Sequence, residues 1–543
     1  MYDLLLIGLK YSFSKVFNEG MVVSEHPIAS KAGVQVLKAG GNAMDAAIAV
    51  NSVLNVVEPA SCGIGGDIFF LIYTKDEGKV KFLNGSGRAS SNATIEFYEN
   101  KGYSSIPTHG SLASITVPGC VNGWNRILEE YGSMKLDQLL KPAILCADRG
   151  FPISNALSNW INEANNINVV TNGWKRIFCL DGLGVEAGDI LVQKDLARTL
   201  RIISDEGCEE FYQGVIAEEI VNYVEKCGGI LSLKDFQQHC SNWDDPVTTN
   251  YREYQIYETA PNSQALTVLI ALNILEGYDL KSLSFQSASY LHLMIEASKL
   301  AYLDRDNHIG DPNFMEIPMK KLISKDYASM RRKLINNESS YIDSKVNSND
   351  LLFRNGDTTY FAIVDKDRNC VSCIQSLYGS FGCHMVVPGT GIVLQNRGSY
   401  FSLNKNHHNR VEPGKRTLHT LCASITFKEF EPMLLFGSMG GDIQPQIHQQ
   451  VFSSIFDYGM NIQKAIGVPR WSIPKSIYSN EQTIFMEERF GEKTFENLKN
   501  KGHKIKCIPN YSSLSGHAHG LEIREEGMIG GADPRGDGVS MGY

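Results

Sequence analysis

The sequence predicts an α+β protein in which β-sheets lie between helical layers. Three observations lead to this prediction. Apolar residues recur with helical spacing near the start of the chain, and a series of short strands separated by turns begins at Thr358. The region between them, from about Gly110 to Asp350, has a mainly helical pattern. Such a mixture favours sheets packed against helices on their faces.

Two helices are predicted at the start of the recognisable region. The first covers Ala29 to Ala39 and stops at a Gly-Gly pair, which suits a helix C-terminus. Asn42 then caps a second helix, with Asp45 three residues later in the position that reaches back to the cap. Small apolar residues line one face of this second helix, which ends before Pro59. It is therefore expected to pack closely against a sheet.

The composition is that of a globular protein, and it argues against some classes of binding partner. The 543 residues are 43% hydrophobic and 20% charged, with a formal net charge of -9 and no basic run. A nucleic-acid or anionic membrane partner is therefore not expected, and no stretch is long enough to span a bilayer. Residues 1–20 lack the features of a secretory signal. We expect them to be a poorly constrained leader, with the recognisable protein beginning near Met21 in the cytoplasm.

Two motifs that could indicate redox chemistry or a phosphate site are interpreted as structural. Cys370 and Cys373 form a C-x-x-C pair, but residues three apart in a strand point to opposite faces. The segment GIGGD, which ends at Asp67, lacks the spacing of a dinucleotide loop and follows a helix rather than a strand. Twelve cysteines in a chain of this length do not form a dense disulfide framework.

The histidine pairs do not predict a metal site. His517 and His519 lie in the segment GHAHG, and His407 and His408 are adjacent in the chain. Neither pair has further ligands at a helix or turn spacing that would complete a site. We therefore expect no metal and no cofactor.

The segment RNGDTTYFAIVD gives the first indication of chemistry. Asp357 directly precedes Thr358 and Thr359 at the start of an apolar strand. A threonine hydroxyl is a poor nucleophile that needs a base, and its own α-amino group can serve only if Thr358 begins a chain. That amine titrates at about 7.7–8.0, so a usable fraction is unprotonated at neutral pH. A Thr-Thr pair is also ordinary in a strand, so this segment alone leaves both interpretations open.

Several further segments make the chain resemble the γ-glutamyltransferase family from about Val22 to Tyr543. They occur in the family's order: SEHPIASKAGVQVLKAGGNAMDAAIAV, EPASCGIGGD, ITVPGCVNGW, GDTTYFAIVD, LLFGSMGGD and GADPRGDG. The resemblance implies a four-layer αββα sandwich with two stacked sheets, of the N-terminal nucleophile hydrolase type. It also implies self-cleavage between Asp357 and Thr358. The products would be a large fragment 1–357 and a small fragment 358–543, which together form one domain and a heterodimer.

The resemblance also implies roles for individual residues. Thr358 would be the nucleophile, with Thr359 and Ser376 close enough to orient it. The backbone N–H groups of Gly440 and Gly441 would hold the developing oxyanion, a task for which residues without Cβ are suited. Arg88, in NGSGRAS, would offer a planar fork to a carboxylate of the substrate.

The chain departs from the family where glutathione enzymes recognise the γ-glutamyl group. They hold its α-amino group with an acidic residue and an asparagine, and its α-carboxylate with a Ser-Ser pair. The corresponding positions here, together with one that is usually glutamine, are Tyr400, Tyr378, His419, Thr420 and Arg397. A neutral phenol cannot balance a buried ammonium as a carboxylate does. These changes resemble the branch related to cephalosporin acylases.

The resulting hypothesis is a self-processing amidohydrolase or acyltransferase that forms a threonine acyl-enzyme. Its substrates would be small γ-glutamyl amides, such as glutathione, or related carboxylate-bearing acyl amides, and its acceptor water or an amine. Two alternatives stay open. One is a glutaryl- or cephalosporin-type acylase with little glutathione activity, and the other is a non-catalytic binding homologue.

Overall fold

Two seven-stranded antiparallel sheets form the centre of the molecule. The computed structural model describes residues 16–166, 171–179, 184–340, 357–473 and 482–543. The first sheet has the order β1 (Val16–Phe17), β20 (Gly527–Ala532), β19 (Ala518–Arg524), β15 (Glu431–Ser438), β14 (Ala423–Lys428), β9 (Tyr254–Glu258) and β8 (Val247–Tyr251). The second has the order β21 (Val539–Gly542), β2 (Met21–Ser24), β10 (Asp357–Val364), β11 (Cys370–Tyr378), β3 (Asp67–Thr74), β4 (Lys79–Gly85) and β7 (Asn242–Asp244).

Side chains of β10 show how the layers are built. Phe361 and Ile363 point to one core, which the second sheet shares with a helical layer. Tyr360, Ala362 and Val364 point to the other core, which lies between the two sheets and continues to a second helical layer. The strand is buried on both faces because alternate side chains enter different cores. The fold is therefore the predicted α+β arrangement of four layers, αββα.

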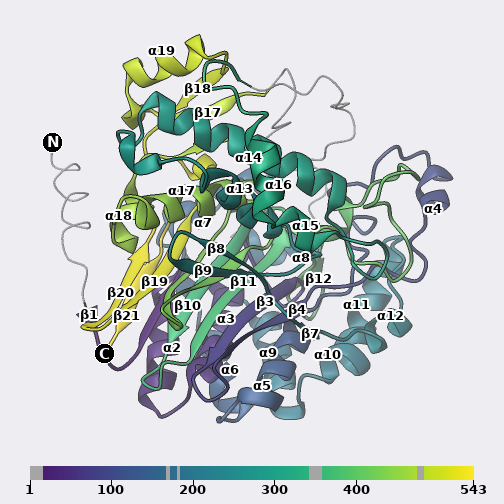
Figure 1. Ribbon diagram of the computed structural model, residues 1–543. Coiled ribbons are helices and arrows are strands. Elements are labelled where there is room, and N and C mark those ends of the chain that lie inside the picture. The colour runs from purple at the N-terminus through teal and green to yellow at the C-terminus, as the bar shows by residue number, and fades with distance from the viewer. Residues whose placement is uncertain (1–15, 167–170, 180–183, 341–356, 474–481) are drawn as a thin grey trace.

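Helices cover the outer face of each sheet, as Figure 1 shows. Those in the core of the second sheet are α2 (Pro27–Lys38), α3 (Ala43–Val57), α5 (Cys120–Tyr131), α6 (Leu136–Arg149), α7 (Asn155–Asn165), α8 (Asn172–Phe178), α9 (Lys194–Glu206), α10 (Glu210–Gln213), α11 (Val215–Lys226) and α12 (Leu233–Gln237). Those in the other core are α13 (Leu266–Leu275), α14 (Ala288–His308), α15 (Met319–Leu322), α16 (Lys325–Arg332), α17 (Gln444–Phe456), α18 (Ile462–Gly467) and α19 (Glu492–Asn500). Within the part of the chain that the structure describes, no helix is long and apolar enough to cross a membrane.

The remaining elements are short. One helix, α4 (Ile95–Glu99), belongs to a small separate cluster of apolar side chains. The minor sheets are β5 (Phe151–Pro152) with β6 (Ile190–Leu191), β12 (Val386–Val387) with β13 (Ile392–Val393), and β16 (Trp471–Ser472) with β17 (Ile484–Glu487) and β18 (Ile505–Ile508).

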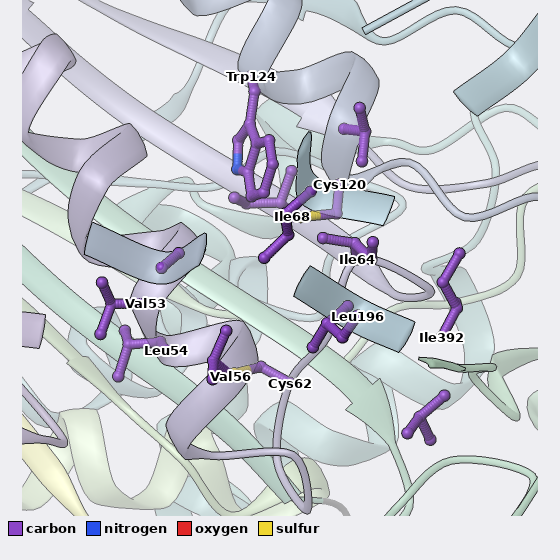
Figure 2. Packing of buried hydrophobic residues seen from close by; sticks show 14 of the residues in the cluster. Val53, Leu54, Val56, Cys62, Ile64, Ile68, Cys120, Trp124, Leu196 and Ile392 are labelled. Atoms are coloured by element: carbon purple, nitrogen blue, oxygen red, sulfur yellow. The ribbon is translucent and has the colours of Figure 1, made fainter. Parts of the chain in front are cut away.

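The predicted capping of α3 is confirmed. The Asn42 side chain accepts hydrogen bonds from the backbone N–H groups of Met44 and Asp45, and the Asp45 carboxylate accepts the Asn42 N–H at 3.0 Å. Every residue of α3 is buried. In Figure 2 its Val53 and Leu54 lie in the same core as Ile68 of β3. This helix thus fixes the sheet that carries β10.

The region from Gly110 to Asp350 is mainly helical in its described part, as predicted, but it also contains short strands that were not predicted. Residues 242–258 form β7, β8 and β9, and these strands extend both large sheets. Each has only three to five residues, too few for alternation to stand out from the surrounding helical pattern. Pairing with β4 and β14, which are distant in the chain, stabilises them instead.

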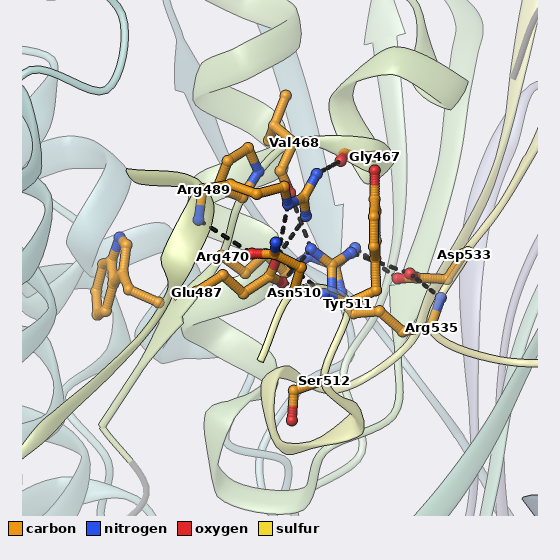
Figure 3. Close-up of polar contacts among 12 residues, drawn as sticks. Gly467, Val468, Arg470, Glu487, Arg489, Asn510, Tyr511, Ser512, Asp533 and Arg535 are labelled. Carbon is orange, nitrogen blue, oxygen red and sulfur yellow. Dashed lines mark hydrogen bonds and ion pairs between the residues drawn. The ribbon is translucent and has the colours of Figure 1, made fainter. Parts of the chain in front are cut away.

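The C-terminal signature GADPRGDG forms a buried ionic network rather than part of the reaction centre (Figure 3). Asp533 accepts hydrogen bonds from Arg470 at 2.6 Å and from Arg535 at 3.0 Å, and Arg535 also contacts Glu487 at 2.8 Å. The Asp533 oxygen that contacts Arg470, Oδ2, also accepts the N–H of Ala518, the first residue of β19. The signature therefore fixes the beginning of a strand whose neighbour, β15, leads to the Gly440–Gly441 loop.

Candidate active site

Thr358 lies in β10 at an irregularity of the sheet. Asp357 is paired with Tyr378 of β11 and Thr359 with Gln375, so the register shifts between these pairs. Thr358 therefore lies opposite two residues, Ser376 and Leu377, and the extra residue of the bulge belongs to β11. A bulge of this kind turns a side chain away from the regular alternation. Thr358 is 1% exposed, and the structure describes the protein as one continuous chain.

Ser376 connects the Thr358 hydroxyl to the carbonyl that precedes it. Thr358 Oγ1 donates to Ser376 Oγ at 3.2 Å, and Ser376 Oγ donates to the carbonyl oxygen of Asp357 at 2.7 Å. The backbone N–H of Tyr378 donates to the same Ser376 oxygen at 2.8 Å and fixes it. A hydroxyl donor on this carbonyl polarises it for attack by a nucleophile. Ser376 thus lies where the sequence predicted it.

Two side chains beside this centre differ in exposure, since Thr359 is buried and Asp357 is half-buried. Among the described residues, the Thr359 hydroxyl has no hydrogen-bond partner. Burial raises the pKa of the Asp357 carboxyl to about 6. The carboxyl on this side of the bond therefore takes up a proton at a higher pH than an exposed aspartate does.

Gly440 and Gly441 follow β15 and lead into α17. Their φ angles are 134° and 56°, values that residues with a Cβ rarely adopt. The Gly441 carbonyl accepts a hydrogen bond from Gln264 at 2.9 Å, and the preceding Met439 N–H bonds to the His517 carbonyl at 2.8 Å. The loop is therefore held in a fixed conformation beside the helix N-terminus, where backbone N–H groups favour negative charge.

His419 and Asp67 form a buried pair behind Ser376. Asp67 of β3 is opposite Ser376 in the sheet, and its Oδ2 lies 3.0 Å from His419 Nε2. Burial lowers the pKa of His419 to about 4, so its ring is neutral at pH 7. Burial raises the pKa of Asp67, but the hydrogen bond from His419 and nearby positive charges lower it overall. His419 is therefore a hydrogen-bond donor that orients an ionised carboxylate.

Arg397 lies fully buried among residues predicted to recognise the substrate. Its Nη1 donates to Thr420 Oγ1 at 3.1 Å, and its guanidinium carbon lies 4.3 Å from the centre of the Tyr378 ring. Tyr378 in turn packs edge-on against Tyr400, with 5.4 Å between ring centres. The structure thus brings four of the predicted positions into one cluster next to Asp357 and Ser376.

Tyr400 has a partner that sequence analysis did not anticipate. Its hydroxyl donates to Asp442 Oδ1 at 2.5 Å, and Arg305 Nη1 contacts the same oxygen at 2.8 Å. Asp442 directly follows Gly441, so the phenol is tied to the end of the glycine loop. Asp442 and Asp67 were both missed as site residues. The segments LLFGSMGGD and EPASCGIGGD, each ending in one of these aspartates, were the available signal.

Arg88 lies apart from this cluster, on the loop after β4. It is partly exposed, and its Nη2 donates to the Asn242 side chain at 3.3 Å, an oxygen that also accepts from Arg416 at 2.9 Å. It lines a cavity of about 240 Å³ together with His239 and Asp235. No hydrogen bond joins Arg88 to the Thr358 cluster within the described ranges.

The cysteine and histidine pairs have structural surroundings. Cys373 packs toward the helical layer and Cys370 between the sheets, on opposite faces of β11 as predicted. His517 and His519 both contact the Glu25 carboxylate.

His407 and His408 stack on each other with 4.5 Å between ring centres, and His408 forms a hydrogen bond with the carbonyl of Ile309. A further buried group, His292, Glu296 and His503, has potential ligand atoms within 4.8 Å of one another. Its carboxylate is paired with Lys299 at 2.7 Å.

The chain forms a four-layer αββα sandwich, and a buried threonine lies at the start of a strand next to the carbonyl that precedes it. These two features together define an N-terminal nucleophile hydrolase before self-cleavage. The family model described as Gamma-glutamyltranspeptidase matches residues 29–543, and the chain belongs to this family. A protein named glutathione hydrolase-like YwrD proenzyme, from Bacillus subtilis, is 41% identical over 97% of this chain and 99% of its own length.

Two further comparisons include proteins named as acting on other amides. An oxamate amidohydrolase proenzyme from Klebsiella pneumoniae is 31% identical over 98% of this chain and 99% of its own length. The crystal structure of a cephalosporin acylase from Bacillus halodurans superposes with a TM-score of 0.90 at 36% identity, covering 98% of this chain and 97% of that one. The family is thus established, and the names of its members span several acyl amides.

Proposed function

We propose that this chain cuts itself before Thr358 and then hydrolyses, or transfers the acyl group of, small carboxylate-bearing amides through a Thr358 acyl-enzyme. The observation that carries the proposal is the hydrogen-bond path from Thr358 Oγ1 through Ser376 Oγ to the Asp357 carbonyl. It supplies a nucleophile, a polarised carbonyl and a fixed geometry in one place.

The self-cleavage step moves the acyl group from nitrogen to oxygen. Thr358 Oγ1 adds to the carbonyl carbon of Asp357, the C–N bond breaks, and the nitrogen takes up the proton that the hydroxyl loses. Water then hydrolyses the ester, leaving a carboxylate on Asp357 and a free α-amino group on Thr358. The Gly440–Gly441 loop stabilises the oxyanion of both steps. Fragments 1–357 and 358–543 remain associated as a heterodimer.

The same centre then acts on substrate. The α-amino group of Thr358 accepts the hydroxyl proton, Thr358 Oγ1 attacks the amide, and the protonated amine leaves. Water or a second amine takes the acyl group from the threonine. Thr359 and Ser376 orient the nucleophile, and Arg88 offers its guanidinium to a carboxylate of the substrate at the cavity that it lines.

Two substrate classes follow from the relatives' names and the altered pocket. γ-Glutamyl amides are the first, in line with the relatives named glutathione hydrolases. Acyl amides without an α-amino group are the second, in line with the oxamate and cephalosporin enzymes. Tyr400 favours the second class, because its hydroxyl already bonds to Asp442 and no carboxylate occupies its own position. We propose a cytoplasmic location for either activity.

The test is a panel of p-nitroanilides incubated with the purified, self-cleaved protein. It contains γ-glutamyl, glutaryl and acetyl anilides, and p-nitroaniline release is scored separately from transfer to a dipeptide. Hydrolysis of at least one carboxylate-bearing anilide, lost in Thr358→Ala, supports the proposal. A cleaved protein inactive on every anilide would favour a binding homologue.

A further inference from the structure

Arg397 is a buried cation without an ion pair among the described residues. Its side chain is 1% exposed, and its only hydrogen bond in that part of the chain runs from Nη1 to Thr420 Oγ1. Its Nε and Nη2 atoms are buried and have no hydrogen-bond partner there. These two nitrogens form one edge of the guanidinium group, the edge that binds a carboxylate through two parallel hydrogen bonds.

The two carboxylates nearest to this guanidinium are already engaged. Asp67 Oδ1 accepts from the Gly87 N–H and Gln395 Nε2 at 3.0 Å each, and its Oδ2 faces His419. Asp442 Oδ1 accepts from Tyr400 and Arg305. Both act on Arg397 only at a distance, and burial lowers the pKa of its guanidinium. A charge left unpaired in this way is destabilising unless a ligand supplies the counterion.

The contacts of Arg397 connect the Nε–Nη2 edge of its guanidinium, through Tyr378, to the residues around Thr358. Its guanidinium stacks on the Tyr378 ring. Tyr378 is paired with Asp357 in the sheet and holds Ser376 through its backbone N–H. Arg397 is therefore separated by one side chain from the residues around the bond that is cut.

We propose that the Nε–Nη2 edge of Arg397 binds a free carboxylate at the far end of the acyl group. The preferred substrates are then monoamides of short dicarboxylic acids that lack an ammonium group near that carboxylate. The inference rests on the proposed function and assigns the acyl specificity of the same site. It assigns the terminal carboxylate of the acyl group to Arg397, where the family resemblance alone pointed to Arg88.

Electrostatics distinguishes this substrate class from γ-glutamyl amides. The α-ammonium of a γ-glutamyl group would face a buried guanidinium, and like charges in a medium of low polarity repel strongly. Arg88, by contrast, is partly exposed and bonded to Asn242, so water screens its charge. The proposal requires that a substrate reaches Arg397 in the self-cleaved protein, in which Asp357 is a chain end.

The experiment compares matched anilides that differ only in the terminal carboxylate. Self-cleaved protein is assayed with glutaryl and valeryl p-nitroanilide, and with succinyl and butyryl p-nitroanilide. Within each pair we expect the wild-type kcat/KM to be roughly ten- to a hundredfold higher for the carboxylate-bearing member. Arg397→Gln should bring this ratio near one, and Arg397→Lys should restore only part of it. Arg88→Gln distinguishes the two arginines, because the inference expects it to change the ratio less than Arg397→Gln does. Arg198→Gln, at a surface arginine paired with Glu219, is the matched control and should leave the ratio unchanged.

Two further measurements keep the test decisive if a variant fails to fold. They are the self-cleavage of each variant and the kcat/KM ratios of the wild type. Each variant is first checked for self-cleavage, which reports folding and the proposed chemistry independently of specificity. If Arg397→Gln does not fold, the wild-type ratios still decide, because a preference for the neutral anilides overturns the inference. A ratio that depends on Arg88 and not on Arg397 also overturns it. Neither result affects self-cleavage or hydrolysis, which test the proposed function independently of this inference.

Discussion

Ser376 is the residue on which the precursor's reaction geometry depends. Its hydroxyl donates to the scissile carbonyl and accepts from both Thr358 and the Tyr378 N–H. Removing such a donor from a developing oxyanion costs about a hundredfold or more in rate. Ser376→Ala should therefore slow self-cleavage by roughly that factor, whereas Ser376→Thr should keep most of it.

A time course on denaturing gels measures this effect from the loss of the uncut chain. The alanine variant must also show a wild-type melting temperature, so that a slow reaction is not misfolding. Cleavage of Ser376→Ala at the wild-type rate would remove Ser376 from the mechanism and leave the glycine loop as the sole source of polarisation.

Single residues in the pocket also show where sequence analysis stopped. Thr358, Ser376 and the glycine pair could be located because each lies in a contiguous segment with a distinctive composition. The contacts of Tyr400 with Asp442 and of His419 with Asp67 join residues 42 and 352 positions apart. Such pairs are set by how the sheets stack, and local spacing contains no information about them.

At the scale of elements, the N-terminal cap of α3 was predicted from the sequence. Its contribution to the free energy of unfolding can be measured. Asn42 caps the fully buried α3, and its amide also donates to the Tyr131 carbonyl at 2.7 Å. Asn42→Ala should lower the free energy of unfolding by about 1–2 kcal/mol. Thr94→Ala, the matched change at the cap of the short helix α4, should have a smaller effect because Tyr98 is the one buried residue of this helix.

Denaturant unfolding of the uncut Thr358→Ala background provides the measurement, since a single chain then unfolds. Equal losses for the two caps would mean that burial of α3 adds nothing to its cap. The long periodic helices and the strands after residue 358 were predicted from sequence in the same local way. The short strands β7, β8 and β9 were not, because they form through pairing with distant strands.

At the scale of the whole molecule, buried histidines predict how stability depends on pH. Burial lowers the pKa of His239 to about 3, and those of His26, His384 and His419 to about 4. Below pH 6.5 the unfolded chain binds protons at these residues and the folded chain does not, so stability falls as the pH drops toward 4. Each fully buried histidine contributes about 2 kcal/mol of this loss by pH 5.

Melting temperatures measured between pH 7 and pH 4.5 test this prediction. His239→Gln removes one titrating group, so its melting temperature should fall less steeply with decreasing pH than that of the wild type. Parallel curves would show that His239 titrates alike in both states. Carboxylates such as Asp67, whose pKa is lowered in the folded chain, lose their contribution only at lower pH.

The two fragments expected from self-cleavage share both sheets. In the second sheet β10 of the small fragment pairs with β2 of the large one, and in the first sheet β14 pairs with β9. Separating them would expose two cores, so the fragments should stay together without a covalent link.

Identification of the small fragment's first residue tests the central claim most directly. The purified protein should give two co-eluting fragments, and N-terminal sequencing of the smaller should begin at Thr358. Thr358→Ala should give one uncut chain of 60.2 kDa. A small fragment that begins at any other residue, or a wild-type chain that stays whole, would contradict Thr358 as the self-processing nucleophile.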